Sequence, residues 1–384
     1  MSVVINTPAS QIGRALATYL LDLGEPLTLI SRSPDKVRPF VERGARLVEG
    51  NIDDPAVLDR AFEGATGVFW LTPPALRPDF HDWAVAAAER AAGAAARRGL
   101  ARAVVLSSVG AHHGPGTGPV GSLLAVERAF EAALPDVTSL RPGFFMENIF
   151  RDLPAIAAKG AVFSPVPAAK RFPWVATRDI GLRAGQLFAD RSWRGHRALG
   201  VHGPADLSWD EVAATLGREL GRPLRYVEVS VDEARKGLAA SGAPPFVVDL
   251  YAEMFEAIRA GKLDPAEPRT DATTTATTLA EFARTVLAPA LAVARHGSRR
   301  FLASLVTRPE ATSEQIAAVL PDEHRRFGEL SRDGVVAGLN LAVDRRRGWL
   351  VVRAQDAAAA EAAVKSLPLS RFWDVEIAEL APEV

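Results

Sequence analysis

The sequence predicts an α/β protein with a doubly wound parallel sheet and a smaller substrate lobe, followed by a ferredoxin-like α+β domain. Short apolar, β-branched segments alternate with amphipathic helical segments in the first half of the chain, as a parallel sheet covered by helices requires. Near the C-terminus the order of elements changes to strand, helix, two strands, helix and strand. The length of 384 residues exceeds the usual size of one core, so two domains are expected.

The first strand, turn and helix organise the N-terminal part of the chain. Residues 3–5 form a β-branched run suited to a buried strand, and residues 11–23 carry apolar side chains at helical spacing. In dinucleotide-binding proteins the intervening turn contains glycines, because its backbone must approach a pyrophosphate at the helix N-terminus. Here the turn from Thr7 to Gly13 contains one glycine, at its end.

The remaining elements of the large sheet follow in chain order, and its ligands are expected at the carboxyl ends of the strands. Further strands are predicted at 26–30, 45–49, 67–71, 103–106 and 137–140, and helices at 55–62, 80–98 and 123–134. A substrate lobe is expected at about 150–290, where Thr177 or Asp179 caps one helix and Ser208 another. The first domain is therefore assigned to residues 1–290.

A linker is predicted at residues 288–299, because Pro289 interrupts the helical pattern there. The second domain is assigned to residues 300–384. Its predicted strands lie at 301–306, 335–343, 349–353 and 373–380, and its predicted helices at 312–330 and 357–367.

Composition excludes several classes of function. The 45 basic and 46 acidic residues nearly cancel, so the basic surface that nucleic-acid binding needs is absent. The chain has no cysteine, which rules out disulfides, thiolate nucleophiles and thiolate metal sites. Neither a membrane span nor a leader sequence is evident, and a cytoplasmic protein is expected. The high content of alanine, arginine, glycine and proline is typical of a GC-rich bacterial genome.

Several segments of residues 1–290 resemble the NmrA-like atypical short-chain dehydrogenases. Besides the first turn, they are 31–36 (SRSPDK), 68–74 (VFWLTPP), 107–111 (SSVGA) and 140–148 (LRPGFFMEN). The resemblance implies a Rossmann-type fold that binds NAD(P). Its usual Gly-x-x-Gly-x-x-Gly turn falls on Thr7, Ser10 and Gly13, so two of three glycines are missing. The side chains at these two positions fill space near a diphosphate, although their hydroxyls are able to donate to phosphate. The alternative is a turn that only connects a strand to a helix.

The expected cofactor is NADP(H). Arg32 follows the second strand, where a guanidinium suits a ribose 2′-phosphate; the alternative is a solvated surface arginine. Asn51 is expected near the adenine, and Thr72 and Pro73 beside the ribose and diphosphate. The expected cofactor-binding residues are Thr7, Ser10, Gln11, Ile12, Gly13, Arg32, Asn51, Thr72, Pro73, Ser107, Arg141 and Gly143.

The acid–base residues of short-chain dehydrogenases are missing. Their Tyr and Lys fall near Pro119 and Leu123, which cannot transfer a proton. His112, His113 and Ser108 are the substitute catalytic candidates, the histidines because they titrate near neutrality; the alternative is that they are solvent-exposed loop residues and scaffolding. An apolar wall for a flat aromatic substrate is expected from Phe144, Phe145, Met146 and Trp174, although core packing explains part of this set equally well.

Residues 300–384 resemble the muconolactone isomerase family of dimeric α+β barrels. The resemblance lies in 367–377 (LPLSRFWDVEI) and in 320–324 (LPDEH). It implies a homodimer, formed because the uncovered sheet face packs against a partner, and a small apolar cavity. Glu323, His324 and Arg325 are candidates to line such a cavity, or else form a solvated helix face.

These features predict an NADP(H)-dependent oxidoreductase that acts on a small aromatic or quinone-like carbonyl compound. Two alternatives stay open. One is an isomerase, cyclase or dehydratase that no longer uses a cofactor, which the missing glycines favour. The other is a regulator that senses a dinucleotide without turnover. The expected partners are a small aromatic substrate and a second copy of the chain, with neither nucleic acid nor membrane.

Overall fold

The computed structural model describes residues 2–297 and 299–381, which form two compact units. The first unit comprises Met1–Asn148, Phe163–Val212 and Tyr226–Thr278, and the second Ile149–Val162, Ala213–Arg225 and Leu279–Val384. Ser298 of the expected linker and residues 382–384 of the expected second domain lie outside the described residues. Each unit is described by itself.

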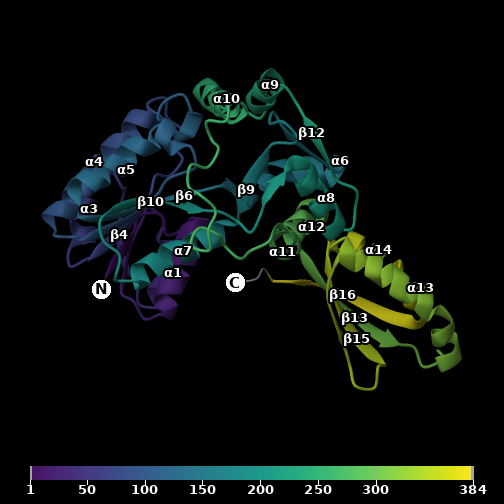
Figure 1. Cartoon of the computed structure of the whole chain (residues 1–384). Coiled ribbons are helices and arrows are strands. Elements are labelled where there is room, and N and C mark those ends of the chain that lie inside the picture. Colours follow the sequence, from purple (N-terminus) through teal and green to yellow (C-terminus); the bar gives the residue numbers. More distant parts are fainter. Residues whose placement is uncertain (1, 298, 382–384) are drawn as a thin grey trace. The chain divides into compact units, whose positions relative to one another are not determined.

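A wholly parallel sheet forms the centre of the first unit, as predicted, and it has seven strands where six were expected (Figure 1). Its strands lie in the order β10-β6-β5-β4-β1-β2-β3. Their bounds are β1 (Val3–Ile5), β2 (Leu27–Ser31), β3 (Arg46–Glu49), β4 (Gly67–Leu71), β5 (Arg102–Leu106), β6 (Asp136–Pro142) and β10 (His196–Val201). The edge strand β10, which pairs with β6, was not predicted from the sequence.

Helices cover both faces of this sheet. They are α1 (Gln11–Asp22), α2 (Arg38–Glu42), α3 (Pro55–Phe62), α4 (Phe80–Arg97), α5 (Leu123–Ala133) and α7 (Thr177–Ala189), with short turns η1 (Pro34–Val37), η2 (Ala111–His113) and η3 (Gly118–Val120). One core contains Leu16 of α1 and Phe188 of α7, and the other contains Phe62 of α3 and Phe130 of α5. Neighbouring side chains of one strand enter opposite cores, as in Phe69 and Trp70 of β4, which explains why such strands are apolar throughout.

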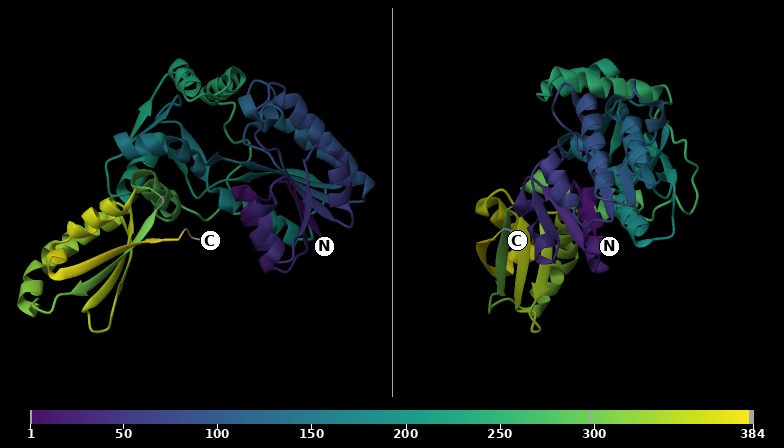
Figure 2. Two further views of the ribbon diagram at one scale, coloured as in Figure 1. Left: turned by 180° about the vertical axis from the view of Figure 1, so that it is seen from behind. Right: turned by 90° about the vertical axis from the view of Figure 1, so that its left-hand side faces the viewer.

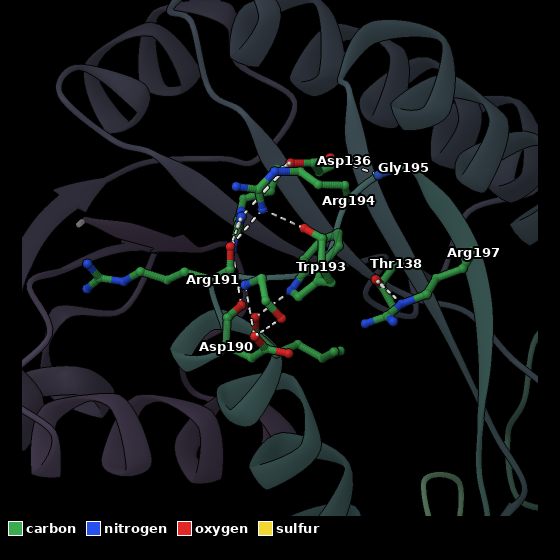
Figure 3. A network of polar contacts seen from close by, with 11 residues as sticks. Asp136, Thr138, Asp190, Arg191, Trp193, Arg194, Gly195 and Arg197 are labelled. Carbon is green, nitrogen blue, oxygen red and sulfur yellow. Dashed lines mark hydrogen bonds and ion pairs between the residues drawn. The ribbon is translucent and has the colours of Figure 1, made fainter.

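The loop between α7 and β10 is held at the amino ends of the strands by the polar network of Figure 3. The buried carboxylate of Asp136 accepts a hydrogen bond of 2.8 Å from the amide of Gly195. The Trp193 ring lies 4.9 Å from the guanidinium of Arg102 and 5.3 Å from that of Arg197. Ligands of parallel sheets bind at the opposite, carboxyl ends, so this network has a structural role.

The elements between β6 and α11 in the chain, apart from α7 and β10, are divided between the two units. They are β7 (Phe144–Phe145), η4 (Met146–Asp152), α6 (Leu153–Lys159), β8 (Ala161–Ser164), β9 (Arg171–Val175), β11 (Asp206–Ser208), α8 (Trp209–Glu219), β12 (Arg225–Glu228), α9 (Val231–Ala240) and α10 (Pro245–Arg259). Ser208 caps α8 as predicted, because its hydroxyl accepts from the amide of Glu211 and its amide donates to the Glu211 carboxylate.

The predicted cap of α7 was wrong. Ala176 is the N-cap, and neither Thr177 nor Asp179 caps this helix through its side chain. The Glu147 carboxylate instead accepts from the amide of Thr177, with both oxygens at 3.0 Å. Asp179 accepts from the amide and hydroxyl of Thr277, at 2.9 and 2.8 Å. The residues that hold the start of α7, Glu147 and Thr277, are therefore both distant from this helix in the sequence.

The linker prediction at 288–299 was also wrong over most of its length. Helix α11 (Leu279–Phe282) passes through the π-helical turn η5 (Ala283–Leu287) into α12 (Ala288–His296). Pro289 occupies the first turn of α12, where its missing N–H is tolerated, and the widened turn precedes it. Pro289 thus lies where the π-helical turn η5 changes to the α-helix α12, and the helix does not end there.

The C-terminal part of the second unit is a four-stranded antiparallel sheet of order β14-β15-β13-β16, the predicted ferredoxin-like order. Its strands are β13 (Arg300–Thr307), β14 (Val336–Leu341), β15 (Arg347–Arg353) and β16 (Trp373–Leu380), and its helices are α13 (Ser313–Arg332), α14 (Ala357–Lys365) and the short η6 (Pro368–Phe372). Thr312 and Gln315 form a capping box at the start of α13. Both long helices lie on one face of the sheet (Figure 2).

Strand parity separates the two faces of this sheet. Phe301, Ala303 and Leu305 of β13 are buried against the helices. The intervening Leu302 and Val306 face the other way, and Trp349 of β15, which pairs with Ser304, lies on the same uncovered face. Val306 and Trp349 keep 45% and 37% of their surface exposed, so an apolar surface remains on the face opposite α13 and α14.

Candidate functional site

An open cavity of about 690 Å³ lies at the carboxyl ends of β1, β2, β3 and β4. Four segments that follow these strands line it, and Trp83 of α4 contributes one wall. Among the expected cofactor residues, the structure brings together Thr7, Ser10, Arg32, Asn51 and Pro73 in this lining. The location agrees with the ligand position expected for a doubly wound sheet.

Asn6 closes the floor of the cavity. Its side chain is buried, donating to the carbonyl of Leu71 and accepting from the amide of the same residue, both at 2.9 Å. These two bonds join the ends of β1 and β4, next to each other in the sheet. The position of the following turn is thereby fixed.

The turn between β1 and α1 is built differently from the expectation. The Ser10 hydroxyl caps α1 by accepting from the amide of Gly13 at 2.9 Å, and it donates to the carbonyl of Thr7 at 2.8 Å. Its one proton is directed to Thr7 in this structure, so a hydrogen bond from the Ser10 hydroxyl to a phosphate stays a prediction. A Cβ at Gly13 would lie 2.1 Å from the Thr7 carbonyl oxygen, which explains the retained glycine.

Anion-binding capacity remains at the N-terminus of α1, a helix of 12 residues. Within the described chain, the amides of Gln11 and Ile12 have no hydrogen-bond partner, as is usual in a first helical turn. Only the backbone of Ile12 is available, because its side chain is in the core. The Thr7 hydroxyl is enclosed and likewise unpartnered within the described residues. The turn therefore offers the backbone amides of Gln11 and Ile12 as free donors, whereas the Thr7 hydroxyl is enclosed and Pro8 has no N–H.

A cationic edge follows β2. Arg32, Ser33 and Lys36 all line the cavity, and the side chains of Arg32 and Lys36 are exposed. No ion pair involves either cation among the residues that the structure describes. Two free cations with a hydroxyl between them fit a phosphate monoester, such as a ribose 2′-phosphate.

The opposite wall combines an aromatic ring with polar groups. The indole N–H of Trp83 donates to Asp53 at 2.8 Å, and the guanidinium of Arg77 lies 5.5 Å from the ring centre. Asn51 and Pro73 adjoin this wall. A ring fixed in this way, beside an amide side chain, suits a planar base. The residues of the cavity thus fit a dinucleotide.

Sequence reasoning missed Asn6, Lys36, Asp53, Arg77 and Trp83. Lys36 lies only four positions after Arg32 in the segment SRSPDK, so the sequence already indicated that both cations lie at the same edge of the cavity. Trp83 lies in α4, far from the strand ends in sequence, and no local signal places it in the cavity.

Two loop histidines follow β5. His112 and His113 occupy the turn η2, both exposed, with ring centres 4.1 Å apart. Although the residue is exposed, partial loss of solvent around its ring, followed by the charges of His113 and Arg141, lowers the pKa of His112 below its ordinary value. A lowered pKa reduces the fraction of imidazolium at neutral pH, so His112 is mostly neutral there. Ser107 is buried with an unpartnered hydroxyl among the described residues, and Ser108 is half-buried beside it.

Arg141 lies outside the cavity lining, in an ion-pair cluster. Its Nε and one terminal nitrogen donate to the two oxygens of Glu127, at 2.9 and 2.6 Å, and its other nitrogen donates to Glu267 at 2.8 Å. Hydrogen bonding to Glu127 raises the pKa of Arg141 above its already high ordinary value. The guanidinium of Arg141 therefore binds Glu127 and Glu267, and it does not line the cavity in which the cofactor was expected.

Gly143 is likewise explained by packing, since a Cβ there would lie 2.0 Å from the carbonyl oxygen of Pro173. Gln11 is exposed on α1 and its side chain contacts the Thr177 hydroxyl, 3.0 Å away. Thr72 is half-buried next to Pro73, and its hydroxyl is enclosed without a partner in the described chain.

Of the four expected substrate residues, two are accessible. Trp174 and Met146 are buried, with the indole N–H of Trp174 donating to the carbonyl of Leu207 at 2.9 Å. Phe144 is half-buried and lies 4.6 Å from the Trp174 ring, and Phe145 is also half-buried. Core packing therefore explains Trp174 and Met146. Phe144 contacts the rings of Trp174 and Trp209, whereas Phe145 packs against the core of the large sheet, so these two half-buried rings do not form one wall.

The two positions that carry the acid–base pair in short-chain dehydrogenases hold residues without an ionisable side chain. Pro119 lies in the turn η3, and Leu123 begins α5. Within the described residues no cluster of three or more histidine or acidic side chains is arranged to hold a metal ion. None of the helices described has the length and apolarity to span a membrane.

Comparison with family models finds two matches. The model of the NmrA-like family covers residues 2–283, and the model of muconolactone delta-isomerase covers residues 301–383.

Curated relatives cover most of the first match. The (4-alkanoyl-5-oxo-2,5-dihydrofuran-3-yl)methyl phosphate reductase of Streptomyces griseus is 31% identical over 266 residues, which cover 67% of this chain and 88% of the relative. The NAD(P)H azoreductase of Xenophilus azovorans is 30% identical over 278 residues, covering 71% and 93%.

Solved structures share the fold. The triphenylmethane reductase of Citrobacter sp., complexed with NADP(H), superimposes with a TM-score of 0.64 at 18% identity, covering 74% of this chain and 99% of that protein. The NADPH-dependent quinone oxidoreductase of Escherichia coli, complexed with NADPH, gives a TM-score of 0.65 at 18% identity with the same coverage. At such identities the likeness shows the fold alone.

Proposed function

The chain belongs to the NmrA-like family, and from this membership together with the site geometry we propose that it is an NADP(H)-dependent reductase of a small aromatic or quinone-like carbonyl compound. A muconolactone delta-isomerase-like domain is fused to its C-terminal side. The observation that carries the proposal is the free cationic edge of Arg32 and Lys36 beside the N-terminus of α1.

Specific residues of this chain would hold the dinucleotide. The free amides of Gln11 and Ile12 would bind its diphosphate, and Arg32, Ser33 and Lys36 its 2′-phosphate. Asn51 and Trp83 would contact the adenine. When bound, the dinucleotide supplies a hydride. The preference for NADP(H) over NAD(H) follows from the two cations, because a ribose hydroxyl gives them no charge to pair with.

Reduction of a carbonyl adds a hydride to carbon and a proton to oxygen. Ser108, at the carboxyl end of β5, would donate a hydrogen bond to the substrate oxygen, and His112 or water would supply the proton. The lowered pKa of His112 makes its imidazolium scarce at neutral pH, so water competes with it as the proton source. One of the half-buried rings of β7, Phe144 or Phe145, would contact a flat substrate.

The names of the two curated relatives support the reaction type. Both are reductases, one of a dihydrofuranone phosphate and one of azo compounds with NAD(P)H. These substrates differ from each other, so the substrate proposed here rests on the aromatic residues near β7 and not on the relatives.

The experiment that tests the proposal measures turnover of 1,4-naphthoquinone by the full-length protein, with and without NADPH. Oxidation of NADPH that depends on both protein and quinone is the expected result. Conversion of a carbonyl substrate at an unchanged rate without NADPH would contradict it and would support a cofactor-independent isomerase, cyclase or dehydratase.

A second candidate is a regulator that binds the dinucleotide without turnover. It is favoured by one observation, namely that Pro119 and Leu123 occupy the positions of the usual acid–base pair. The same experiment separates the two, because a regulator binds NADPH but does not oxidise it in the presence of a panel of quinones and aromatic ketones.

A further inference from the structure

Three polar side chains in contact with one another lead to the start of α1. They are Glu147 of η4, Thr177, the first residue of α7, and Gln11, the first residue of α1. The hydroxyl oxygen of Thr177 lies 2.6 Å from Oε1 of Glu147 and 3.0 Å from Oε1 of Gln11. Thr177 is buried, Glu147 is half-buried and Gln11 is exposed, so these contacts connect the interior of the first unit to solvent. The proposed reduction involves none of the three side chains.

The Thr177 hydroxyl has a single proton, although two oxygens lie within hydrogen-bond distance of it. When Glu147 is ionised, its carboxylate has no proton to donate, so the 2.6 Å contact requires the proton of Thr177. Gln11 then has to turn an N–H group toward the hydroxyl, because two oxygens without a proton between them repel each other. When Glu147 is protonated, it donates to Thr177, and Thr177 donates to the amide oxygen of Gln11.

The structure shows the arrangement of the protonated form. The amide oxygen of Gln11 faces the Thr177 hydroxyl, so the amide nitrogen is directed away from it. Within the described residues this nitrogen has no hydrogen-bond partner. Because Gln11 is exposed, its two side-chain N–H groups are available at the start of α1, next to the free backbone amides of Gln11 and Ile12. In the ionised form of Glu147, the amide oxygen would take their place.

The surroundings of Glu147 favour its neutral form. Burial raises the pKa of Glu147 above its ordinary value, and the charge of Asp179 adds to this effect, whereas hydrogen bonds from Thr177 oppose it. Asp179 is held in place by Thr277, and the guanidinium of Arg178 lies 3.5 Å from it. No cation forms an ion pair with Glu147 in the part of the chain that the structure describes. Both protonation states of Glu147 are therefore accessible closer to neutral pH than for an ordinary glutamate.

We propose that Glu147 and Thr177 are positioning residues for the dinucleotide, which act through the side chain of Gln11. Protonation of Glu147 turns the N–H groups of the Gln11 amide outward, where they donate to the diphosphate at the N-terminus of α1. Ionisation of Glu147 turns the amide oxygen outward, which repels the same diphosphate. Dinucleotide binding therefore takes up a proton at Glu147, and the affinity falls as Glu147 ionises with rising pH. This inference rests on the proposed function, because it needs a dinucleotide at α1.

The first test uses the full-length protein without nucleotide and does not depend on the proposed function. The side-chain N–H signals of Gln11 are followed by NMR as a function of pH and are identified by their loss in Gln11→Ala. In the wild type they should shift as Glu147 ionises. Glu147→Gln cannot ionise, and its carboxamide keeps an acceptor for the Thr177 amide and a donor for the Thr177 hydroxyl. The Gln11 signals of this variant should stay constant over the same range.

The second test measures NADPH affinity by calorimetry over that pH range. Wild type and Glu147→Gln should bind equally at low pH, and the wild type should bind at least about threefold more weakly at high pH. The ratio of the two affinities cancels the titration of groups that both proteins share. In a Gln11→Ala background, Glu147→Gln should have no effect, because the amide that transmits it is absent. Gln186→Ala removes another exposed amide side chain, from α7, and should bind like the wild type.

Wild-type Gln11 signals that do not respond to pH, or that shift equally in Glu147→Gln, would overturn the proposal whether or not a dinucleotide binds. Identical affinity profiles of wild type and Glu147→Gln would overturn it as well. An equal gain from Glu147→Gln with and without Gln11 would mean that Glu147 acts on the diphosphate by its charge alone. Absence of NADPH binding at every pH would contradict the proposed function and remove the role of Gln11 toward a diphosphate, while the NMR titration would still decide how Glu147 orients Gln11.

Discussion

Arg32 and Lys36 give the dinucleotide cavity its proposed preference for a 2′-phosphate, since both cations line it and form no ion pair within the described chain. Replacing both by alanine should weaken NADPH binding at least tenfold, because each charged hydrogen bond contributes about 1.5–3 kcal/mol. NADH binding should change little, since NADH has no phosphate at this position. Titration calorimetry of the variant with both dinucleotides measures the two effects.

Arg38 provides the matched control. It is an exposed arginine in the same segment that pairs with Asp35 and does not line the cavity. Arg38→Ala should leave both affinities unchanged. An equal loss for NADPH and NADH in the Arg32→Ala, Lys36→Ala protein would mean that these cations act on the structure and not on the 2′-phosphate.

His112 makes a prediction about pH. If its imidazolium supplies the proton, the rate should fall as the pH rises through its pKa, which partial loss of solvent, His113 and Arg141 place below the ordinary value. Maximal activity is then expected on the acidic side of pH 6.5. The fall in rate with rising pH should be absent from the pH–rate profile of His112→Gln. It should still be present in the profile of the adjacent variant His113→Gln. A wild-type profile that is flat from pH 5 to 8 would assign the proton to water.

At the scale of elements, the β1–α1 turn decides how closely a diphosphate can approach α1. Thr7 carries a Cβ and an enclosed, unpartnered hydroxyl where glycine is usual in the family, so Thr7→Gly should increase NADPH affinity several-fold. Ser10 should be kept, because it caps α1. Thr7→Ser retains the Cβ and serves as the control in the same calorimetric titration. No gain on Thr7→Gly would show that this side chain does not obstruct binding.

Six of the seven strands of the large sheet could be predicted, most of them because strands buried on both faces are short, apolar runs. The edge strand β3 is polar and exposed at both ends, and it was predicted from its place in the alternation of strands and helices. The edge strand β10 could not be predicted, since its first residues, His196 and Arg197, are polar and exposed. The helix α12 was mistaken for a linker because Pro289 signals a break in sequence, whereas the preceding π-helical turn accommodates it in the structure.

The candidate site was predictable only where residues directly follow strands. Thr7, Arg32, Asn51 and Pro73 were placed by the rule that strand ends meet at one edge of a parallel sheet. That rule does not show which of these side chains already bind other residues of the protein. Arg141 was expected at the cofactor, but Glu127 and Glu267, distant in sequence, bind its guanidinium. Trp174 was expected at the substrate, but tertiary packing buries it completely.

At the scale of the whole molecule, one face of the C-terminal sheet exposes apolar side chains to solvent, which is unfavourable for a monomer. Leu302, Val306, Trp349 and Val351 form an apolar surface there, and we propose that a second copy of the chain packs on it. Val306→Asp combined with Trp349→Asp should convert a dimer into a folded monomer, because two charges would be buried without partners. Sedimentation velocity at micromolar concentration measures the change.

Val343→Asp introduces the same charge into a fully exposed turn and should leave the dimer intact. A wild-type chain that sediments as a monomer, or a double variant that remains dimeric, would defeat the proposal. Truncation after residue 290 is a poorer test, since it would cut α12, which packs on α6 in the second unit. A fragment that ends at Gly297 keeps this helix whole.

The central claim is that a first turn with a single glycine still forms an NADP(H) site. Titration calorimetry of the full-length protein with NADPH and with NADH tests it most directly. The account predicts saturable binding of NADPH that is about tenfold tighter, or more, than that of NADH. Binding of neither dinucleotide, or equal affinity for both, would contradict it.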